Sequence, residues 1–332
     1  MESSRKGRTS PTITDVAELA GVSRAIASRA LSHESRPVSA DKRARVLEAA
    51  EKLGFKPNLL ARSLTTKTVN LIAVIVNHIH DFSDLDLFDF LIGEIQSIGK
   101  QVIFVRVGSV QRAEEFLRNG VAYHVDAALV FSDFAAAADV RKMFRNAAVL
   151  MLNGMHDGTS PSVVPNEVIG ITEAVADAAG KGVATAAMVT GRISSPVEQS
   201  RIATYKSEMK RHGIRLVAEL RGDYSYASGR QMAQSSGWTD VDAVFCTSDA
   251  MAMGVMDVHR EAFPHNKPAR FRLYGFDNLS LTDFEAYPIS SIGYDKKAYV
   301  GEILRFLTRT GEVAGDRVDV TVPTFFVSRA TS

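Results

Sequence analysis

The stretch from Thr12 to Leu64 constrains the fold of this chain most, because its apolar residues recur with the spacing of short helices. They form two faces on either side of Gly21, with Val16, Leu19 and Ala20 before it and Val22, Ile26, Ala30 and Leu31 after it. Asp15 lies in the first turn of the first helix, and Ser23 is placed to cap the second. Two helices that cross over a glycine turn are typical of a helix-turn-helix, whose second helix enters the major groove of DNA. Other small helical domains contain the same unit, so the pattern alone leaves a non-binding domain open.

The charge distribution favours DNA binding. Residues 1–68 contain 13 Lys and Arg against 7 Asp and Glu, a net charge of +6, whereas the remaining residues contain 26 against 31, a net charge of −5. A basic segment is attracted to phosphates whatever the base sequence. Arg24 and Arg29 lie on the second predicted helix, and arginine suits both guanine edges and phosphates. We therefore expect a basic DNA-binding head on an acidic body.

This segment resembles the lactose-repressor (LacI/GalR) family of bacterial transcription regulators over its whole length. The matching motifs are DVAELAGVS, SRA, VSADKRARVLEAAEKLGF and PNLLARSL. The resemblance implies that Arg24 and Ala25 select bases and that Leu64 wedges into the minor groove at the operator centre. The residues for which it implies DNA contact are Thr14, Ser23, Arg24, Ala25, Arg29, Ser39, Asn58, Ala61 and Leu64.

Residues 57–68 are predicted to form a hinge. Pro57 suits the start of a short helix and Asn58 can cap Leu59–Thr65, but isolated helices shorter than about 12 residues are marginal in water. We expect this helix to form only when two hinges pair on DNA; an ordinary linker is the alternative. Around it we expect a disordered arm at 1–11, a helix-turn-helix domain at 12–56 and an effector-binding and dimerisation domain at 69–332.

From Asn70 onward, apolar runs typical of strands alternate with helical patterns. The expected strands are Leu71–Val76, Val102–Val107, Ala127–Phe131, Val149–Leu152, Ala186–Val189, Val217–Leu220, Ala243–Cys246 and Phe271–Tyr274. The expected helices are Leu85–Ile98, Arg112–Val121, Ile169–Ala179, Val197–His212, Ala227–Ser236 and Ala250–Glu261. Repeated βαβ units imply mainly parallel sheets, so we expect an α/β body in two similar lobes with a cleft between them.

The body resembles the type I periplasmic-binding-protein fold that the same family uses to bind effectors. The matching motifs are SRIATYKSEM, GDYSYASG, VDAVFCTSDAMAMG, LYGFDN and the terminal VSRATS. The resemblance implies a first lobe of about 69–164 and 294–323 and a second lobe of about 165–293 and 324–332. It places the chain crossings near Pro165, Tyr294 and Pro323, and the ligand at the carboxyl ends of strands.

The resemblance also implies which side chains contact an effector. Arg201 matches an arginine that grips a sugar ring or an acid, and Asp277 matches an aspartate that accepts from hydroxyls. For these two, a mutual salt bridge or a solvated position is the alternative, and Asp249 could instead serve the first turn of a helix. The candidate effector contacts are Arg201, Tyr224, Ser248, Asp249, Asp277, Asn77, Asp81 and Phe82.

The first lobe departs from the family pattern, which puts a standard hexose ligand in doubt. Residues 80–84 replace the usual Ser-Asn-Pro-Phe-Phe, Pro165 replaces an aspartate, and Val183 replaces a histidine after glycine. His78 and His80 have no third ligand near them in sequence, so no metal is expected.

The motifs that the sequence lacks exclude several classes of protein. GxGxxG after a strand, GxxxxGK[ST], HExxH and Gly-x-Ser-x-Gly are absent, so we expect neither an enzyme nor a cofactor. Leu71–Val76 is too short to cross a bilayer and the first residues lack an apolar signal, so we expect a cytoplasmic protein without membrane contact. Cys246, the single cysteine, fits a reducing compartment and is expected to be buried.

Together these observations predict a homodimeric repressor of a catabolic sugar or sugar-derivative operon. It would bind double-stranded operator DNA and be released by a small effector such as a sugar, sugar acid, polyol or purine. No leucine heptads follow the last motif, so we expect dimers rather than tetramers. A corepressor-dependent and an effector-independent regulator are alternatives, and a solute-binding protein is contradicted by the attached head.

Overall fold

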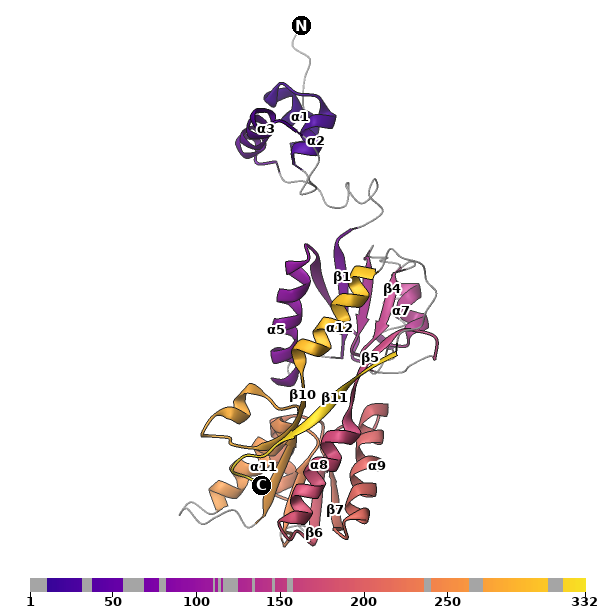
Figure 1. Ribbon diagram of the computed structural model, residues 1–332, viewed down its shortest axis with the longest axis vertical. Helices are drawn as coiled ribbons and strands as arrows, with labels where there is room; N and C mark the ends of the chain where they lie inside the picture. Colours follow the sequence, from indigo (N-terminus) through magenta and orange to yellow (C-terminus); the bar gives the residue numbers. More distant parts are fainter. Residues whose placement is uncertain are drawn as a thin grey trace. The chain divides into compact units, whose positions relative to one another are not determined.

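The computed structural model describes residues 11–31, 38–55, 69–77, 82–109, 111–112, 115, 125–132, 135–144, 147–153, 158–235, 240–262, 271–309 and 319–332, with 82–84 described by backbone alone. The chain divides into two compact units, Met1–Val69 and Asn70–Ser332 (Figure 1). We refer to the first as the head and to the second as the body.

The described part of the head contains helices α1 (Ile13–Ala20), α2 (Arg24–Ala30) and α3 (Ala40–Leu53). Thr12 starts α1 with a capping box, because its hydroxyl accepts from the Asp15 N–H while the Asp15 carboxylate accepts from the Thr12 N–H. Gly21 ends α1 with a φ of 62°, a left-handed conformation that costs glycine little. The Ser23 hydroxyl accepts from the Ile26 N–H at 3.3 Å, which confirms the predicted cap of α2.

A small core of valine and alanine side chains holds the three helices together. Its buried members are Val16, Ala17, Ala20, Ala27, Ala30, Val46, Ala49 and Ala50. The prediction that Leu19 belongs to the buried face of α1 is wrong, since its side chain is 53% exposed. Small residues at positions 17, 20, 27 and 30 let the helices approach closely, and the contact face of α1 turns towards Ala17 instead.

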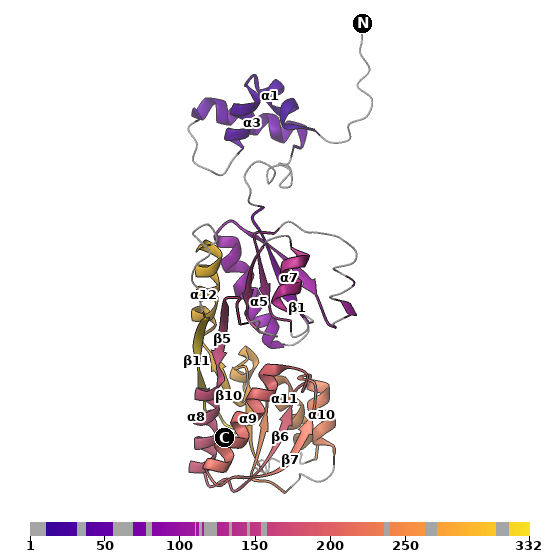
Figure 2. The same cartoon turned by 90° about the vertical axis from the view of Figure 1, so that its right-hand side faces the viewer.

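The first sheet of the body has the strand order β2-β1-β3-β4-β5-β11, and every pair in it is parallel. Its own strands are β1 (Leu71–Val76), β2 (Gln101–Arg106), β3 (Ala127–Val130), β4 (Ala148–Met151) and β5 (Ser162–Asn166). Helices α5 (Phe82–Ser97) and α12 (Lys296–Arg309) cover one face, and α7 (Ala137–Met143) covers the other (Figures 1 and 2). Alternate β1 residues point to opposite faces, Val74 towards α5 and Ile75 towards α7.

The second sheet has the order β11-β10-β9-β8-β6-β7 and is parallel except for the β10–β11 pair. Its own strands are β6 (Thr185–Thr190), β7 (Arg215–Arg221), β8 (Ala243–Cys246), β9 (Arg272–Phe276) and β10 (Ser290–Tyr294). Its helices are α8 (Glu167–Gly180), α9 (Pro196–Arg211), α10 (Tyr226–Ala233) and α11 (Asp249–Ala262), with a short 3-10 helix η1 (Ser280–Asp283). Met188 of β6 packs towards α8 and α9, whereas Val189 packs towards α11.

Strand β11 (Asp319–Val327) belongs to both sheets. Residues 319–323 pair with β5, and residues 324–327 pair with β10. The chain also passes between the sheets where β5 leads into α8 and where β10 leads into α12 (Figure 1). The body therefore consists of two lobes joined by three adjacent segments.

The predicted α/β fold class with a small helical head is confirmed. Each expected strand is present, with ends that differ by up to two residues, but β5, β10 and β11 were not predicted. These three are the joining segments; Pro165, Pro323 and Gly293 interrupt their apolar patterns, since proline and glycine weaken regular strands. Helices α7 and α12 were also missed, and most of the expected helix 112–121 lies outside the described residues.

Candidate DNA-binding surface and effector cavity

The candidate DNA contacts in the described part of the head all lie on its surface. Thr14, Ser23, Arg24, Ala25, Arg29 and Ser39 are exposed. By helical spacing, positions 24, 25 and 29 share one side of α2, opposite the buried Ala27 and Ala30. Ser39 occupies the N-cap position of α3 without a side-chain bond to that helix. Asn58, Ala61 and Leu64 lie outside the described residues.

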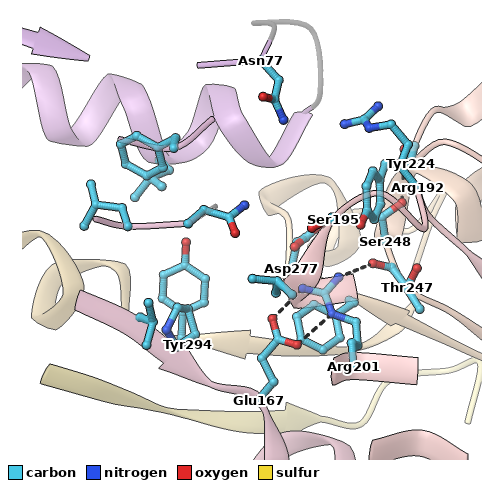
Figure 3. A pocket seen from close by; sticks show the side chains of 18 of the residues that line it. Asn77, Glu167, Arg192, Ser195, Arg201, Tyr224, Thr247, Ser248, Asp277 and Tyr294 are labelled. Carbon is cyan, nitrogen blue, oxygen red and sulfur yellow. Dashed lines mark hydrogen bonds and ion pairs between the residues drawn. The ribbon is translucent and has the colours of Figure 1, made fainter. Parts of the chain in front are cut away.

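A cavity of about 230 Å³ lies between the two lobes of the body (Figure 3). Five of the eight predicted effector contacts line it: Asn77, Arg201, Tyr224, Ser248 and Asp277. Asp81 lies outside the described residues, and Phe82 is described by its backbone alone. Asp249 is not part of the described lining. The lining side chains come from the carboxyl ends of strands and the segments that follow them, the usual ligand position in open α/β sheets.

Arg201, on α9, makes hydrogen bonds through all three of its guanidinium nitrogens. Its Nε and Nη2 donate to the two Glu167 carboxylate oxygens at 2.9 and 2.6 Å, and its Nη1 donates to the Thr247 carbonyl at 2.8 Å. Its guanidinium carbon lies 3.8 Å from the centre of the Phe276 ring. Burial acts to lower the pKa of Arg201, but the charge and hydrogen bonds of Glu167 outweigh it and hold that pKa well above its ordinary value. The guanidinium is therefore permanently charged and held in one orientation.

Glu198, one turn before Arg201, is fully buried and bonded on both oxygens. Oε1 accepts from the Gly191 N–H and the Thr247 hydroxyl, both at 2.6 Å, and Oε2 accepts from the Tyr224 hydroxyl at 3.0 Å. Gly191 allows this arrangement, because a Cβ on it would lie 1.9 Å from Cε1 of the Tyr224 ring. The buried carboxylate thus fixes the aromatic wall of the cavity.

The loop after β9 brings Asp277 to the cavity in a strained conformation. Asp277 has a φ of 104° and Asn278 a φ of 46°, and the Asp277 N–H donates to the Ile292 carbonyl at 2.7 Å. Arg329, from the terminal motif, donates to the Asn278 side-chain oxygen at 2.7 Å. The loop conformation therefore depends on the C-terminal segment.

Asp249 supports the same loop from inside the lobe. It is fully buried, and its two oxygens accept from the Ser291 hydroxyl at 2.6 Å and the Leu279 N–H at 2.8 Å. Burial raises the pKa of its carboxyl to about 7 despite these bonds. Ser248, its neighbour, lines the cavity and also caps α11 by accepting from the Met251 N–H. Of the Ser-Asp pair, only the serine reaches the cavity in the described structure.

The first lobe contributes a mostly apolar wall. Its aromatic and aliphatic members are Leu87, Phe88, Phe131, Leu152, Tyr294 and Tyr299. Asn77 lies across the cavity from Arg201 (Figure 3), and its Oδ1 accepts from the Ser132 hydroxyl at 2.7 Å. The ligand space is therefore polar on the second-lobe side and apolar on the first-lobe side.

Several residues of the site were not predicted from the sequence. They are Glu167, Arg192, Ser195, Glu198 and Thr247, together with the aromatic wall of the first lobe. Glu198 could have been found from its i, i+3 spacing to Arg201 on one helix, a spacing that brings side chains together. Glu167 is 34 residues from Arg201, and no local spacing connects them.

Two other predictions concern metal and thiol chemistry. His78 and His80 lie outside the described residues, and within those that are described no three His, Cys, Asp or Glu side chains group as a metal would need. Cys246 is buried as expected, and burial raises the pKa of its thiol. No helix in the described regions is both long and apolar enough for a membrane crossing.

Comparisons with known proteins agree with this architecture. Residues 12–58 match the family described as bacterial regulatory proteins, lacI family, and residues 175–332 match the periplasmic binding protein-like domain. The HTH-type transcriptional regulator AscG of Escherichia coli (strain K12) is 27% identical over 307 residues, which cover 88% of this chain and 90% of that protein. The HTH-type transcriptional repressor PurR of Vibrio vulnificus is 26% identical and covers 86% of this chain and 87% of its own length.

Solved structures share the fold, some of them along nearly the whole chain. A Lac repressor structure with bound ONPG superposes with a TM-score of 0.82 at 23% identity and covers 98% of this chain and 100% of its own. The matched relatives are transcriptional regulators, not enzymes. The predicted resemblance is confirmed: this chain is a DNA-binding transcriptional regulator and belongs to the lacI family of bacterial regulatory proteins.

Proposed function

We propose that this regulator is a homodimeric repressor of a catabolic sugar or sugar-derivative operon, released from its operator by an effector that binds between the lobes. The observation that carries the proposal is the combination of an exposed arginine pair on α2 with a polar and aromatic cavity in the attached body. One relative, 26% identical over 306 residues, is named as the repressor of a sugar operon: the ribose operon repressor of Escherichia coli (strain K12).

Dimer formation follows from the way short operators are read. A two-fold dimer presents two α2 helices to two half-sites, and a single head contacts too few bases for high specificity. A Lac repressor structure of the same fold is a dimer bound to operator. We propose that Asn58, Ala61 and Leu64 complete the DNA contact between the two heads, and that effector binding weakens this contact by about 1–3 kcal/mol of coupling.

The head assignment is tested by Arg29→Ala on a duplex selected by the wild-type chain from a randomised library. A good arginine–base pair contributes about 1–3 kcal/mol of discrimination, so we expect about 5- to 150-fold weaker binding to the selected duplex and an unchanged thermal midpoint. Lys52→Ala on α3 is the matched control, because it removes the same charge from an exposed site off α2. Equal losses in the two variants would contradict base reading by Arg29.

The cavity assignment is tested by thermal-shift screening against sugars, polyols and nucleosides, followed by operator release with each hit. Asp277→Asn keeps a residue type that tolerates positive φ and removes the charge. We expect this variant to bind operator normally and to need at least about tenfold more effector, as expected for loss of a hydrogen bond to a charged group. Asp240→Asn, at an exposed site, is the control. A normal response in Asp277→Asn would exclude its role.

A further inference from the structure

The guanidinium of Arg201 is already engaged by a carboxylate from its own chain. Glu167, the first residue of α8, binds it through two parallel hydrogen bonds of 2.9 and 2.6 Å (Figure 3). Both side chains are largely buried, with 10% exposure for Arg201 and 14% for Glu167. This bidentate geometry is the one by which arginine recognises a free carboxylate ligand. Glu167 therefore occupies the position on Arg201 that an acidic ligand would take.

The hydrogen-bonding capacity of Arg201 is nearly used up. A guanidinium carries five N–H donors, one on Nε and two on each terminal nitrogen. Glu167 takes one from Nε and one from Nη2, and the Thr247 carbonyl and Glu198 take those of Nη1. Among the described residues this leaves one N–H, on Nη2, for a ligand. One neutral acceptor can use it, whereas a second bidentate carboxylate cannot.

The charges around the cavity also disfavour an anion. Among the described lining residues, Arg201 and Arg192 supply two positive charges and Glu167 and Asp277 supply two negative ones; the buried Glu198, which is not part of the lining, pairs with Arg201 as well. Arg192 is partly exposed, donates to the Asp223 carbonyl at 2.9 Å and lies over the Tyr224 ring at 4.9 Å. The described first-lobe lining contributes amides and aromatic rings but no Lys or Arg. The carboxylates of the chain therefore already balance the positive charges of the described lining, which leaves no excess positive charge to attract an anionic ligand.

We infer that Glu167 is an internal carboxylate that occupies the paired Nε and Nη2 donors of Arg201 and so prevents acidic ligands from binding there. The cavity then takes an uncharged or cationic molecule with an apolar face. The hydroxyl or amino groups of that molecule would meet Asp277 and Ser248 of the second lobe, and its apolar face would lie against Phe88 and Tyr299 of the first. This inference rests on the proposed function in treating the cavity as the effector site. It narrows the candidate effectors by removing sugar acids and other carboxylates.

Removing Glu167 gives a direct test. In Glu167→Ala the buried guanidinium loses its main partner and a carboxylate-sized space opens, so we expect a lower thermal midpoint for the full chain. Sodium acetate should then raise that midpoint in a saturable way, compared with sodium chloride at equal concentration. The wild-type chain and the double variant Glu167→Ala/Arg201→Met should show no such difference between the two salts. An acetate effect no larger in Glu167→Ala than in these two controls would overturn the inference.

A second measurement uses the wild-type chain alone and so does not depend on the folding of a variant. It compares molecules of similar size and shape that carry no charge, a positive charge or a negative charge: D-glucose, D-glucosamine and D-glucuronate, and benzyl alcohol, benzylamine and benzoate. Stabilisation by an alcohol or amine that exceeds that of the matching acid supports the inference. Stabilisation by glucuronate or benzoate beyond the chloride control, and beyond the matching alcohol, overturns it.

Failure of the inference and failure of the proposed function give different results. The acetate and charge comparisons report on the cavity through the thermal midpoint and involve no DNA. If acetate rescues Glu167→Ala but no ligand releases the operator, the acid-excluding site stands and the effector-released repressor does not. If an acid both stabilises the wild-type chain and releases the operator, the proposed function stands and the role of Glu167 does not.

Discussion

At the scale of single residues, the site depends on how side chains are positioned by buried partners. Tyr224 has a φ of 74°, donates to Glu198 through its hydroxyl and covers the backbone of Gly191 with its ring. The close packing of Tyr224, Glu198 and Gly191 fixes the ring at the cavity wall. Side chains that contact a ligand generally need such support to hold their orientation.

Gly191→Ala tests this packing. A Cβ at that position would lie 1.9 Å from the Tyr224 ring, so the ring must move and the buried Glu198 loses a partner. We expect a lower thermal midpoint and a weakened effector response. In the double variant Gly191→Ala/Tyr224→Ala the midpoint should recover above that of the single variant, because the overlap is removed. If removing the ring brings no recovery, the clash with Tyr224 is not the cause.

Asp249 predicts a pH dependence of stability. Its carboxyl has a pKa of about 7 in the folded chain and 3.8 when unfolded, so the folded state holds its proton more tightly. That stabilisation is complete below the unfolded pKa and is lost as the pH rises through 7. We expect the thermal midpoint of the wild-type chain to fall, relative to Asp249→Asn, between about pH 5 and about pH 8. A constant difference over this range would contradict the assignment of the titration to Asp249.

At the scale of elements, helix α8 contributes a side chain to the cavity and also packs against the strands that join the two sheets. Its first residue, Glu167, binds Arg201, while Gly170 packs against the strands that connect the lobes. The Gly170 N–H also donates to the Thr324 hydroxyl at 2.9 Å, where β11 changes partner from β5 to β10. The start of α8 is therefore held against the crossing segments.

The two glycines of α8 make a matched pair for testing this contact. An alanine Cβ at Gly170 would lie 2.5 Å from Cγ2 of Ile292, whereas one at Gly180 meets nothing within 4 Å. We expect Gly170→Ala to destabilise the body by about 1–3 kcal/mol through overpacking. Gly180→Ala should be neutral or stabilising by up to about 1 kcal/mol, since alanine favours helix. Denaturant unfolding of the two variants measures the difference; equal stabilities would show that α8 does not pack tightly there.

At the scale of the whole body, a polar contact joins α5 of the first lobe to η1 of the second lobe. Asp86, on α5 of the first lobe, accepts from the Ser280 N–H at 2.9 Å and its hydroxyl at 3.0 Å in the second lobe. Lys296 lies 3.4 Å from the same carboxylate. Partial burial acts to raise the pKa of Asp86, but the hydrogen bonds from Ser280 and the charge of Lys296 hold it below its ordinary value. The contact links the two lobes outside the described cavity lining.

Asp86→Ala should therefore weaken effector binding, although Asp86 is not among the described residues that line the cavity. If the Asp86–Ser280 contact stabilises the ligand-binding arrangement by about 1 kcal/mol, its loss should raise the ligand dissociation constant about fivefold. Asp89→Ala, at an exposed position on the same helix, should leave that constant unchanged. Titration calorimetry with a hit from the thermal-shift screen measures both. Equal constants for Asp86→Ala and the wild-type chain would show that the contact does not bias the lobes.

The sequence by itself determined the family and those local elements whose apolar pattern is regular. The glycine at position 21, the cap at Ser23 and the apolar runs from Leu71 to Tyr274 depend on residues a few positions apart, and hydrogen bonds within a helix or along a strand act over that range. Motif resemblance also pointed to Arg201, Tyr224 and Asp277, which the structure places on one cavity.

Only the tertiary structure decided which of those residues are available to a ligand. Arg201 meets Glu167 across 34 positions of sequence, Glu198 meets Thr247 across 49, and Asp249 is turned inward to Ser291 across 42. The sheet order that brings these pairs together depends on β5, β10 and β11, whose proline- and glycine-containing sequences lack a clear strand pattern. A charged side chain must find a partner when it is buried, and that partner is set by the packing of distant elements rather than by neighbours in the chain.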